Sequence, residues 1–523
     1  MRLLRSTAII ASLTLVSRLL GFVRDVLIAN FFGAGFISDA FFTAFKLPNV
    51  FRRMFAEGAF NAAFVPLYAK RLEQDGEASA DNFASETASV LFFFVACLVI
   101  AFELTMPFSL NIIGNGLDKN VNASGITTYD LAVVYAQITM PYLLFMSMTA
   151  MFSGVLNTRG FFALSAGVPI ILNLFMISAL MITPIFDLSQ RQTGYALTAA
   201  ISLSGVAQMM IVYWGCRRAG VRIRPRLPRL TPGVRRMITL GVPGLISAGI
   251  TQINLVVSHG IATQQEGAAS WLTYADRLYQ LPLGMIGIAM GVALLPALSR
   301  RLRAGDEAGA NRSMNRGMEI AAFLTLPAAF ALFIIPEFLI SGLFERGDFT
   351  ASTTQQVSKA LRFFALGLPA FVLIKVLTPA FFARENMRTP MYFAGLSALI
   401  NVSLGLFLFW KIGFEGLALA TTIAAWVNVA GLGFILLRDK DLVLDARLLS
   451  RFPRIVLASA VMGFALWATL PIFPDLSQSH IIIDLLSLIG ISGFGLIIYA
   501  IAASLLRAFG LHDIRDALSK KAN

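Results

Sequence analysis

Long apolar runs with almost no charge recur along this chain, for example over residues 90–101 and 481–506. A helix that crosses the roughly 30 Å hydrocarbon core of a bilayer needs about 20 predominantly apolar residues. Only 14% of the 523 residues are charged, which is well below the share in ordinary soluble domains. A membrane β-barrel would show short alternating segments instead. The sequence therefore predicts an all-α polytopic membrane protein and excludes a soluble globular enzyme.

The apolar runs, divided at charge clusters and at Pro and Gly, predict fourteen transmembrane helices. The first run follows Arg2 and Arg5, as in a signal peptide, but no small-residue cleavage site closes it. Arg18, Arg24 and Asp25 continue its helical pattern, so we interpret it as a retained span. The predicted centres are Leu15, Phe45, Phe94, Tyr142, Ile171, Ser204, Ile250, Gly284, Ala329, Leu368, Leu399, Thr422, Met462 and Gly493.

Basic residues gather in the loops that follow even-numbered spans. The opposite loops carry only Lys119, Arg191, Arg346 and Lys411. Because cytoplasmic loops are enriched in Lys and Arg, this asymmetry predicts that both termini are cytoplasmic. It also accounts for the formal net charge of +13, so no nucleic-acid partner is needed to explain a basic chain.

The two halves of the chain repeat. The segment AFVPLYAKRL at residues 63–72 matches ALLPALSRRL at residues 293–302, an offset of 230. Pro141 matches Pro369, and Asn173 matches Asn401, each at an offset of 228. Six spans separate equivalent points, so we expect two six-helix lobes of the same orientation, related by a pseudo-two-fold axis along the membrane normal. The expected organisation is an N-terminal lobe over residues 1–217, a basic cytoplasmic linker over 218–236, a C-terminal lobe over 237–437, and two additional helices with a cytoplasmic tail over 438–523.

The linker region contains many arginines and no acid. Its basic residues are Arg217, Arg218, Arg222, Arg224, Arg226, Arg229, Arg235 and Arg236. Two interpretations stay open: a loop that sets topology, which we favour, and a segment that captures anionic lipid headgroups.

Further charges fall inside the predicted spans. They are Arg18, Arg24 and Asp25 in the first span, Asp39, Lys46, Arg52, Arg53 and Glu57 in or beside the second, and Asp276 and Arg277 in the eighth. An intramembrane Arg costs roughly 2.5–3.5 kcal/mol on translocon scales, so such residues need partners or a wet cavity. Cations outnumber acids in this set, so internal salt bridges absorb only part of it. A positive cavity suits a phosphate-bearing lipid or sugar, because Arg binds phosphate oxygens bidentately.

Asp39, Lys46 and Arg53 follow one another at seven-residue spacing, and Glu57 lies one turn further on. This spacing predicts a polar stripe along the second span, provided that Pro48 does not break the helix.

The run SRLLGFVRDVLIANFFGAGFISDAFFTAFKLPNVFRRMFAEGAFNAAFVP, residues 17–66, resembles the amino-terminal signature of the MurJ/MviN lipid II flippases of the MOP exporter superfamily. ADRLYQLPLG, residues 275–284, resembles the second signature of that family. The resemblance implies that the chain moves lipid II, the undecaprenyl-pyrophosphate-linked peptidoglycan precursor, from the inner to the outer leaflet of the bacterial cytoplasmic membrane. The implied mechanism is alternating access.

The resemblance also implies a set of substrate-binding residues. Matched by motif, these are the cavity arginines Arg18, Arg24, Arg52 and Arg277, the neighbouring acids Asp25 and Asp39, and the cavity or gate residues Glu57 and Ser270, to which the polar stripe adds Arg53. We hypothesise that Asp25 and Asp39 compete with pyrophosphate for the arginines and so permit release. The last two spans resemble those that form a groove for the prenyl tail.

No cofactor or metal is expected. The seventh span contains Asn254 and His259 but no carboxylate, which argues against an acidic sodium site there. Coupling to the membrane potential or to a monovalent cation stays open. Cys97 and Cys216 lie in apolar runs. We therefore interpret them as packing residues rather than as a disulfide pair. The expected partners are lipid II and membrane lipids, with cell-wall synthesis proteins left open, and we expect a monomer.

The main alternative is a flippase for another undecaprenyl-linked oligosaccharide, which would share the basic cavity. A multidrug cation antiporter would need an acidic cavity instead. A membrane enzyme would need a general base or a carboxylate cluster for a metal. His259, His480 and His512 form no such motif, and we interpret His259 as a packed residue.

Overall fold

The computed structural model describes residues 2–54, 60–119, 125–473 and 481–508, and Glu57 lies outside these ranges. Within them the chain forms helices joined by short turns, with no β-strand. Helices satisfy their own backbone donors and acceptors, which a segment surrounded by lipid requires. The class predicted from the sequence, an all-α polytopic membrane protein, is therefore confirmed.

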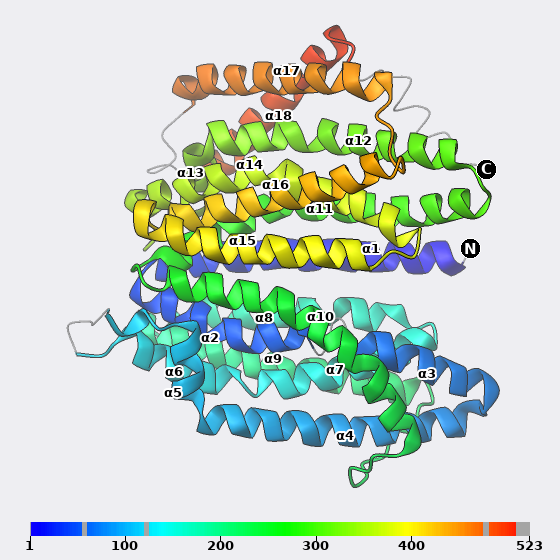
Figure 1. Ribbon diagram of the computed structural model, residues 1–523. Coiled ribbons are helices and arrows are strands. Elements are labelled where there is room, and N and C mark those ends of the chain that lie inside the picture. The colour runs from blue at the N-terminus through cyan, green and yellow to red at the C-terminus, as the bar shows by residue number, and fades with distance from the viewer. Residues whose placement is uncertain (1, 55–59, 120–124, 474–480, 509–523) are drawn as a thin grey trace. The chain divides into compact units, whose positions relative to one another are not determined.

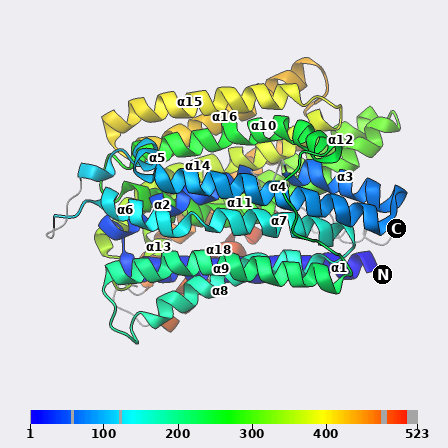
Figure 2. The same ribbon diagram turned by 90° about the horizontal axis from the view of Figure 1, so that it is seen from below.

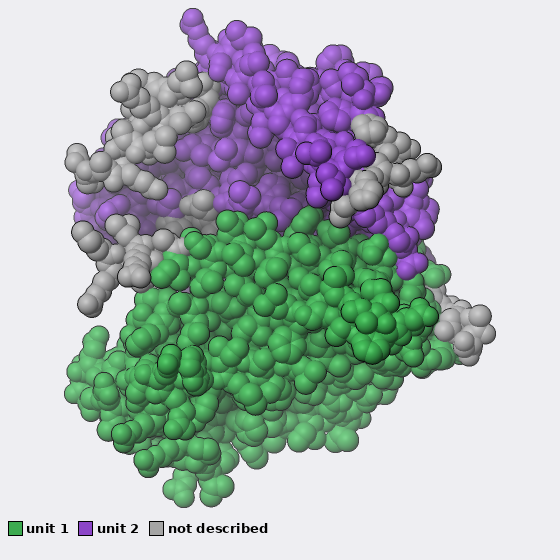
Figure 3. All heavy atoms as spheres, turned by 180° about the vertical axis from the view of Figure 1, so that it is seen from behind, with its two compact units in different colours: residues 1–270 green, residues 271–523 purple. Residues whose placement is uncertain are grey.

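The chain divides into two compact units, residues 1–270 and residues 271–523 (Figure 3). The helices of the first unit are α1 (Arg2–Phe32), α2 (Phe36–Arg52), α3 (Phe60–Gln74), α4 (Gly76–Leu104), α5 (Met106–Ile113), α6 (Thr128–Thr139), α7 (Tyr142–Thr158), α8 (Phe162–Ile182), α9 (Gln190–Arg218) and α10 (Pro232–Ala262), with a short 3-10 turn at Leu117–Lys119 (Figure 1).

The second unit begins within α11 (Ala268–Arg303). Its further helices are α12 (Glu307–Ile334), α13 (Pro336–Phe344), α14 (Ala351–Phe382), α15 (Arg388–Ile412), α16 (Glu415–Arg438), α17 (Ala446–Thr469) and α18 (Ile481–Leu505), with a 3-10 turn at Leu470–Ile472 (Figure 1).

In the first unit, α8 packs on both α1 and α9, and α9 also packs along α7 (Figure 2). Large side chains fill the interior, including the fully buried Tyr68, Tyr135 and Tyr142. By contrast, Phe92, Phe93 and Phe94 of α4 are half exposed, as expected of side chains that contact lipid. Apolar side chains thus both fill the interior of this unit and cover the exposed face of α4.

In the second unit, α16 packs on both α14 and α15, and α12 packs on α14 and α17 (Figure 1). The last pair, α17 and α18, shares a core with α12 that includes Met462, Ile491 and Tyr499. The Tyr499 hydroxyl donates a hydrogen bond to the carbonyl oxygen of Phe323 at 2.7 Å. The C-terminal pair is therefore anchored to α12 rather than loosely appended.

All fourteen predicted span centres lie within helices. In the described part of the chain, ten helical segments are long and apolar enough to cross a membrane, counting α6 and α7 as one. α1, α2, α10 and α11 are not among these ten. A helical membrane protein is thus established, whereas the count of fourteen spans stays a prediction.

The helix boundaries repeat at the offset that the sequence matches predicted. α1 and α10 both begin and end 230 residues apart, and α5 and α13 begin 230 residues apart. One difference is at Pro141, where α6 ends and α7 begins, whereas α14 continues through Pro369. Contacts nevertheless group α10 with α3, α4 and α5 in the first unit. The predicted lobe boundaries remain a prediction.

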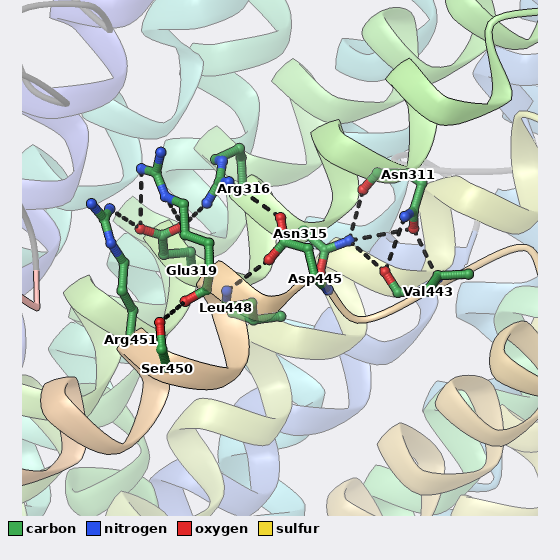
Figure 4. Close-up of polar contacts among 10 residues, drawn as sticks. Asn311, Asn315, Arg316, Glu319, Val443, Asp445, Leu448, Ser450 and Arg451 are labelled. Carbon is green, nitrogen blue, oxygen red and sulfur yellow. Dashed lines mark hydrogen bonds and ion pairs between the residues drawn. The ribbon is translucent and has the colours of Figure 1, made fainter.

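A buried carboxylate joins α12 to the beginning of α17 (Figure 4). Glu319 is 1% exposed and forms ion pairs with Arg316 of its own helix and with Arg447 and Arg451 of α17. The Arg451 Nη1 lies 2.5 Å from Glu319 Oε1. Burying a carboxylate costs several kcal/mol unless cations and hydrogen bonds surround it, so this arrangement fixes α17 against α12.

We expect Glu319→Gln to lower the free energy of unfolding by about 2–3 kcal/mol, because it leaves three guanidinium groups facing one another; their partial exposure keeps the loss below that of a fully buried pair. Thermal unfolding of the purified chain in detergent measures the effect. Glu307→Gln, an exposed acid on the same helix, is the matched control and should leave the midpoint unchanged. Equal midpoints for both variants would contradict this role of Glu319.

Candidate functional site

Arg24 of α1 is held by two acceptors in the first unit. Its Nε and Nη2 donate to Asp25 Oδ1 at 3.0 and 2.7 Å, and its Nη1 donates to Asn173 Oδ1 of α8 at 2.8 Å. Asn173 in turn donates from Nδ2 to the carbonyl oxygen of Ser17 at 2.9 Å. Asn173 therefore links two turns of α1 to α8 and fixes the direction of the Arg24 side chain.

The Arg24–Asp25 pair is largely removed from solvent, since each side chain is 11% exposed. Arg24 was predicted from the sequence to be an unpaired surplus cation of the membrane region, and its ion pair with Asp25 contradicts this. A buried guanidinium needs a counter-charge, and the adjacent carboxylate supplies it. The predicted proximity of Arg24 and Asp25 is confirmed.

Asp39 of α2 accepts hydrogen bonds from the beginning of α11. Its Oδ2 accepts from the Gly267 amide at 2.7 Å, and its Oδ1 accepts from the amide and the hydroxyl of Ser270 at 2.9 and 2.6 Å. The Ser270 hydroxyl also lies 2.9 Å from the Ser38 hydroxyl. The first amides of a helix lack partners within the helix and carry partial positive charge, so a carboxylate stabilises them.

This geometry gives Asp39 a role that differs from the hypothesis drawn from the sequence. Asp39 was expected to interact with cations of the polar stripe, but its hydrogen bonds in the described residues go to Gly267 and Ser270. The carboxylate thus acts as a latch between α2 and the residues that begin α11. We call this contact the Asp39–Ser270 latch.

The other predicted residues are more dispersed. Arg18 and Arg53 are exposed, and the half-buried Arg52 donates from Nε to Asn49 Oδ1 at 3.1 Å. Arg277 is half-buried on α11 and belongs to the second unit. Pro48 lies within α2 without interrupting it, so Asp39 and Lys46 of the predicted stripe lie on one continuous helix, whereas Arg53 follows the last residue of α2.

His259 is buried, and its Nε2 lies 2.9 Å from the Thr43 hydroxyl of α2. The interpretation of His259 as a packed residue is confirmed. Among the described residues, no group of three His, Cys, Asp or Glu side chains is arranged to hold a metal ion. Asn401, the counterpart of Asn173 in the internal repeat, accepts a hydrogen bond from the Thr421 hydroxyl at 3.1 Å.

Sequence reasoning missed the contacts of two site residues. Asn173 was noted only as a marker of the internal repeat, and Ser38 was not noted at all. The repeat was a usable signal for Asn173, because an amide retained at equivalent positions of two apolar helices needs a polar partner. Ser38 has no comparable signal, since Ser occurs freely in membrane helices.

Comparison with known proteins identifies several that are similar. A family profile described as "Lipid II flippase MurJ" matches residues 28–486. The "Probable lipid II flippase MurJ" of Rhizobium meliloti (strain 1021) is 43% identical over 525 aligned positions, covering 100% of this chain and 97% of the relative. A solved structure, "Lipid II flippase MurJ, inward closed conformation", is 26% identical with a TM-score of 0.77 and covers 95% of this chain and 98% of that one.

A more distant structure shares the fold alone. It is an inward-facing multidrug resistance MATE family transporter of the MOP superfamily, 14% identical, with a TM-score of 0.67 over 83% of this chain and 98% of that one.

We expect Asp39→Asn to loosen the beginning of α11, because an amide keeps one acceptor but loses the charge that faces the helix N-terminus. The loss is about 1 kcal/mol, or roughly fivefold faster hydrogen exchange at Gly267–Ser270, measured by mass spectrometry of peptides from this segment. Ser38→Ala, which removes only the hydroxyl contact to Ser270, should have a smaller effect. Asp187→Asn, at an exposed turn, is the control. Unchanged exchange in Asp39→Asn would exclude the latch.

Proposed function

This chain belongs to the MurJ family of lipid II flippases, and we propose that it moves lipid II from the inner to the outer leaflet of the cytoplasmic membrane. The observation that carries this proposal is similarity along the whole chain, including both signature segments. The same similarity favours lipid II over another undecaprenyl-linked oligosaccharide. On this proposal, the chain is a transporter rather than an enzyme.

Arg24, Asp25 and Asn173 are here called the Arg24 cluster. This cluster supports binding of an anionic headgroup. Asp25 neutralises Arg24 between substrates, which lowers the cost of keeping a guanidinium in a low-dielectric region. A pyrophosphate group offers several oxygens to the same N–H donors and can replace both Asn173 and Asp25 as their acceptors. Asp25 would then recapture Arg24 as the pyrophosphate leaves, which is the competing role proposed for it. Arg18, Arg52, Arg53, Arg277, Glu57, Asp39 and Ser270 complete the proposed binding and gating set.

Alternating access is the proposed mechanism, with fourteen spans arranged as two six-helix lobes and an additional C-terminal pair. Helix boundaries repeated at an offset of 230 support this arrangement. The Asp39–Ser270 latch is a suitable switching contact, because hydrogen bonds to helix-terminal amides are modest in energy and can be exchanged for water.

We further propose that the chain is a multi-pass protein of the bacterial inner membrane with both termini in the cytoplasm. It would act as a monomer on lipid II among other membrane lipids and without a cofactor. The energy would come from the membrane potential or from a monovalent cation.

Expression of the chain should rescue a cell depleted of its own lipid II flippase. Arg24→Ala should abolish rescue at normal protein levels, and Arg24→Lys should restore it poorly, because a single ammonium cannot contact Asp25 and Asn173 as a planar fork does. Growth and cell shape are the readout, together with accumulation of lipid II in the inner leaflet.

Arg191→Ala removes one positive charge from an exposed position far from the cluster in sequence and is the control, which should rescue fully. Failure of the unaltered chain to rescue, despite normal insertion, would overturn the proposed function. Full rescue by Arg24→Ala would instead remove Arg24 from the binding set.

The topology is tested with single cysteines in a background that lacks Cys97 and Cys216. A membrane-impermeant thiol reagent applied to intact cells should label position 411 but not position 226, because the loop charges place Arg226 in the cytoplasm. Both positions should react once the cells are opened. Labelling of position 226 in intact cells would contradict the proposed orientation.

A further inference from the structure

The segment between α9 and α10, residues 219–231, is here called the connector. It runs in extended form along α4, and backbone amides of alternate connector residues donate to side chains one helical turn apart. The pairs are Arg222 N with Asp81 Oδ2 at 2.8 Å, Arg224 N with Ser85 Oγ at 3.0 Å, and Arg226 N with Ser89 Oγ at 3.1 Å. Two extended residues advance about 6.6 Å and four helical residues about 6 Å, so the two rows stay in register.

The side chains of these alternate residues lie on one side of an extended strand. Arg222, Arg224 and Arg226 are all exposed. Arg226 also donates from Nη2 to Asn82 Oδ1 at 2.8 Å. Because the backbone makes the three contacts with α4, docking of the connector does not require arginine at these positions.

The second unit repeats the first two of these contacts at residues that are not arginine (Figure 4), whereas the position that corresponds to Arg226 is Arg447. The amides of Val443 and Asp445 donate to Asn311 Oδ1 at 2.9 Å and to Asn315 Oδ1 at 3.0 Å. Asn311 and Asn315 lie 230 residues after Asp81 and Ser85. The same backbone arrangement is thus compatible with Val and Asp, and the arginines of the connector call for another explanation.

The position of the connector along α4 indicates what the arginines contact. Ser89 immediately precedes the apolar run that begins at Val90, so the third amide contact brings Arg226 to the edge of the membrane region. Beyond it, Leu227 is 77% exposed and Leu230 is 62% exposed. Exposed leucines that alternate with arginines at this depth suit the boundary between headgroups and acyl chains.

The first turns of α10 add a shallow recess beside Leu230. It has a volume of about 430 Å³ and is lined by Leu230, Pro232, Arg235, Arg236 and Thr239. Two acids of α4 lie beside the connector, and neither forms an ion pair with its arginines among the described contacts: Asp81 pairs with Arg159 at 2.8 Å, and Glu86 accepts from the Thr231 hydroxyl at 2.7 Å. The region therefore has a positive surplus next to an apolar surface.

We propose that connector residues 224–230, together with the recess on α10, form a binding site for the headgroups of anionic phospholipids in the cytoplasmic leaflet. The guanidinium groups contact the phosphodiester, and Leu227 and Leu230 contact the first acyl carbons. This site is separate from the Arg24 cluster and does not depend on which lipid the protein transports.

Binding is tested on the purified full chain in detergent with three probes: short-chain phosphatidylglycerol, short-chain phosphatidylcholine and inorganic phosphate. Native mass spectrometry counts bound lipid, and competition with phosphate is read in the same titration. We expect phosphatidylglycerol to bind about tenfold or more tightly than phosphatidylcholine. Equal competition by inorganic phosphate would reduce the site to a simple anion site and overturn the proposal. Displacement of phosphatidylglycerol by an equal concentration of lipid II would assign the recess to that lipid and overturn it as well.

The variant Arg224→Gln, Arg226→Gln, Arg229→Gln should weaken phosphatidylglycerol binding about tenfold or more, since each basic residue near an anionic surface contributes roughly fivefold. The control Arg300→Gln, Arg303→Gln, Arg312→Gln removes the same charge from other exposed arginines and should bind as the unaltered chain does. Equal weakening in both triple variants would indicate diffuse attraction and overturn the site. So would unchanged binding in the first.

Two further variants guard against misfolding of the Gln variant. Lysine at positions 224, 226 and 229 keeps the charge and should retain binding within about threefold. Leu227→Ser, Leu230→Ser should weaken binding of phosphatidylglycerol but not of inorganic phosphate. Loss of both by the leucine variant, or of neither, would contradict the proposed contact with acyl carbons.

Discussion

A carboxylate inside an apolar helical bundle must be surrounded by donors, because its desolvation costs several kcal/mol. Among the described residues, five carboxylates are buried: Asp25, Asp39, Asp81, Glu319 and Asp484. Asp25 pairs with its neighbour Arg24, whereas the contacts of the other four join elements that are distant in sequence. Asp81 of α4 contacts Arg159 and the connector, Glu319 joins α12 to α17, and Asp484 pairs with Arg346 at 2.5 Å and so ties α18 to the end of α13. Apolar packing alone does not fix the positions of these helices, because an apolar helix face packs against lipid as well as against another helix. The electrostatic contacts of the carboxylates therefore help to determine these positions.

The donors around these carboxylates differ in kind, and this difference bears on function. Glu319 faces three guanidinium groups and cannot be released without leaving several charges unpaired. Asp39 faces neutral amides and a hydroxyl, so its release leaves only modest hydrogen bonds to be satisfied by water. A transporter needs both kinds of contact. The strong ones keep α17 and α18 attached to α12, while the weaker latch at the beginning of α11 is suited to opening.

The sequence predicted the helices well because apolar length and charge asymmetry are large, additive signals. It also predicted that Arg24 and Asp25 lie together, since they are neighbours on one helix. It did not predict the role of Asp39, because the partners are backbone amides, which are the same for every residue type.

The connector was recognised as basic, but its docking on α4 was missed for the same reason. Asp81, Ser85 and Ser89, spaced by four residues, were the available signal. Glu319 was not singled out from the sequence, although its i, i+3 spacing from Arg316 is compatible with an ion pair.

Comparison of the two repeated halves distinguishes the contacts that both halves share from the charged groups that only one half contains. At the offset of 230, Asp81 and Ser85 correspond to Asn311 and Asn315, which perform the same docking with different atoms. Arg24 corresponds to Asn254, and Ser89 corresponds to Glu319. Two of the three contacts to connector backbone amides are thus kept in both halves, whereas the third and the charged groups are not. Each charge buried in an apolar bundle carries its own desolvation cost, so the shared backbone frame does not require both halves to keep the same charges. The charges can therefore differ between the halves while these two backbone contacts stay the same. The first half contains the Arg24 cluster, and the second half keeps the two backbone contacts without it.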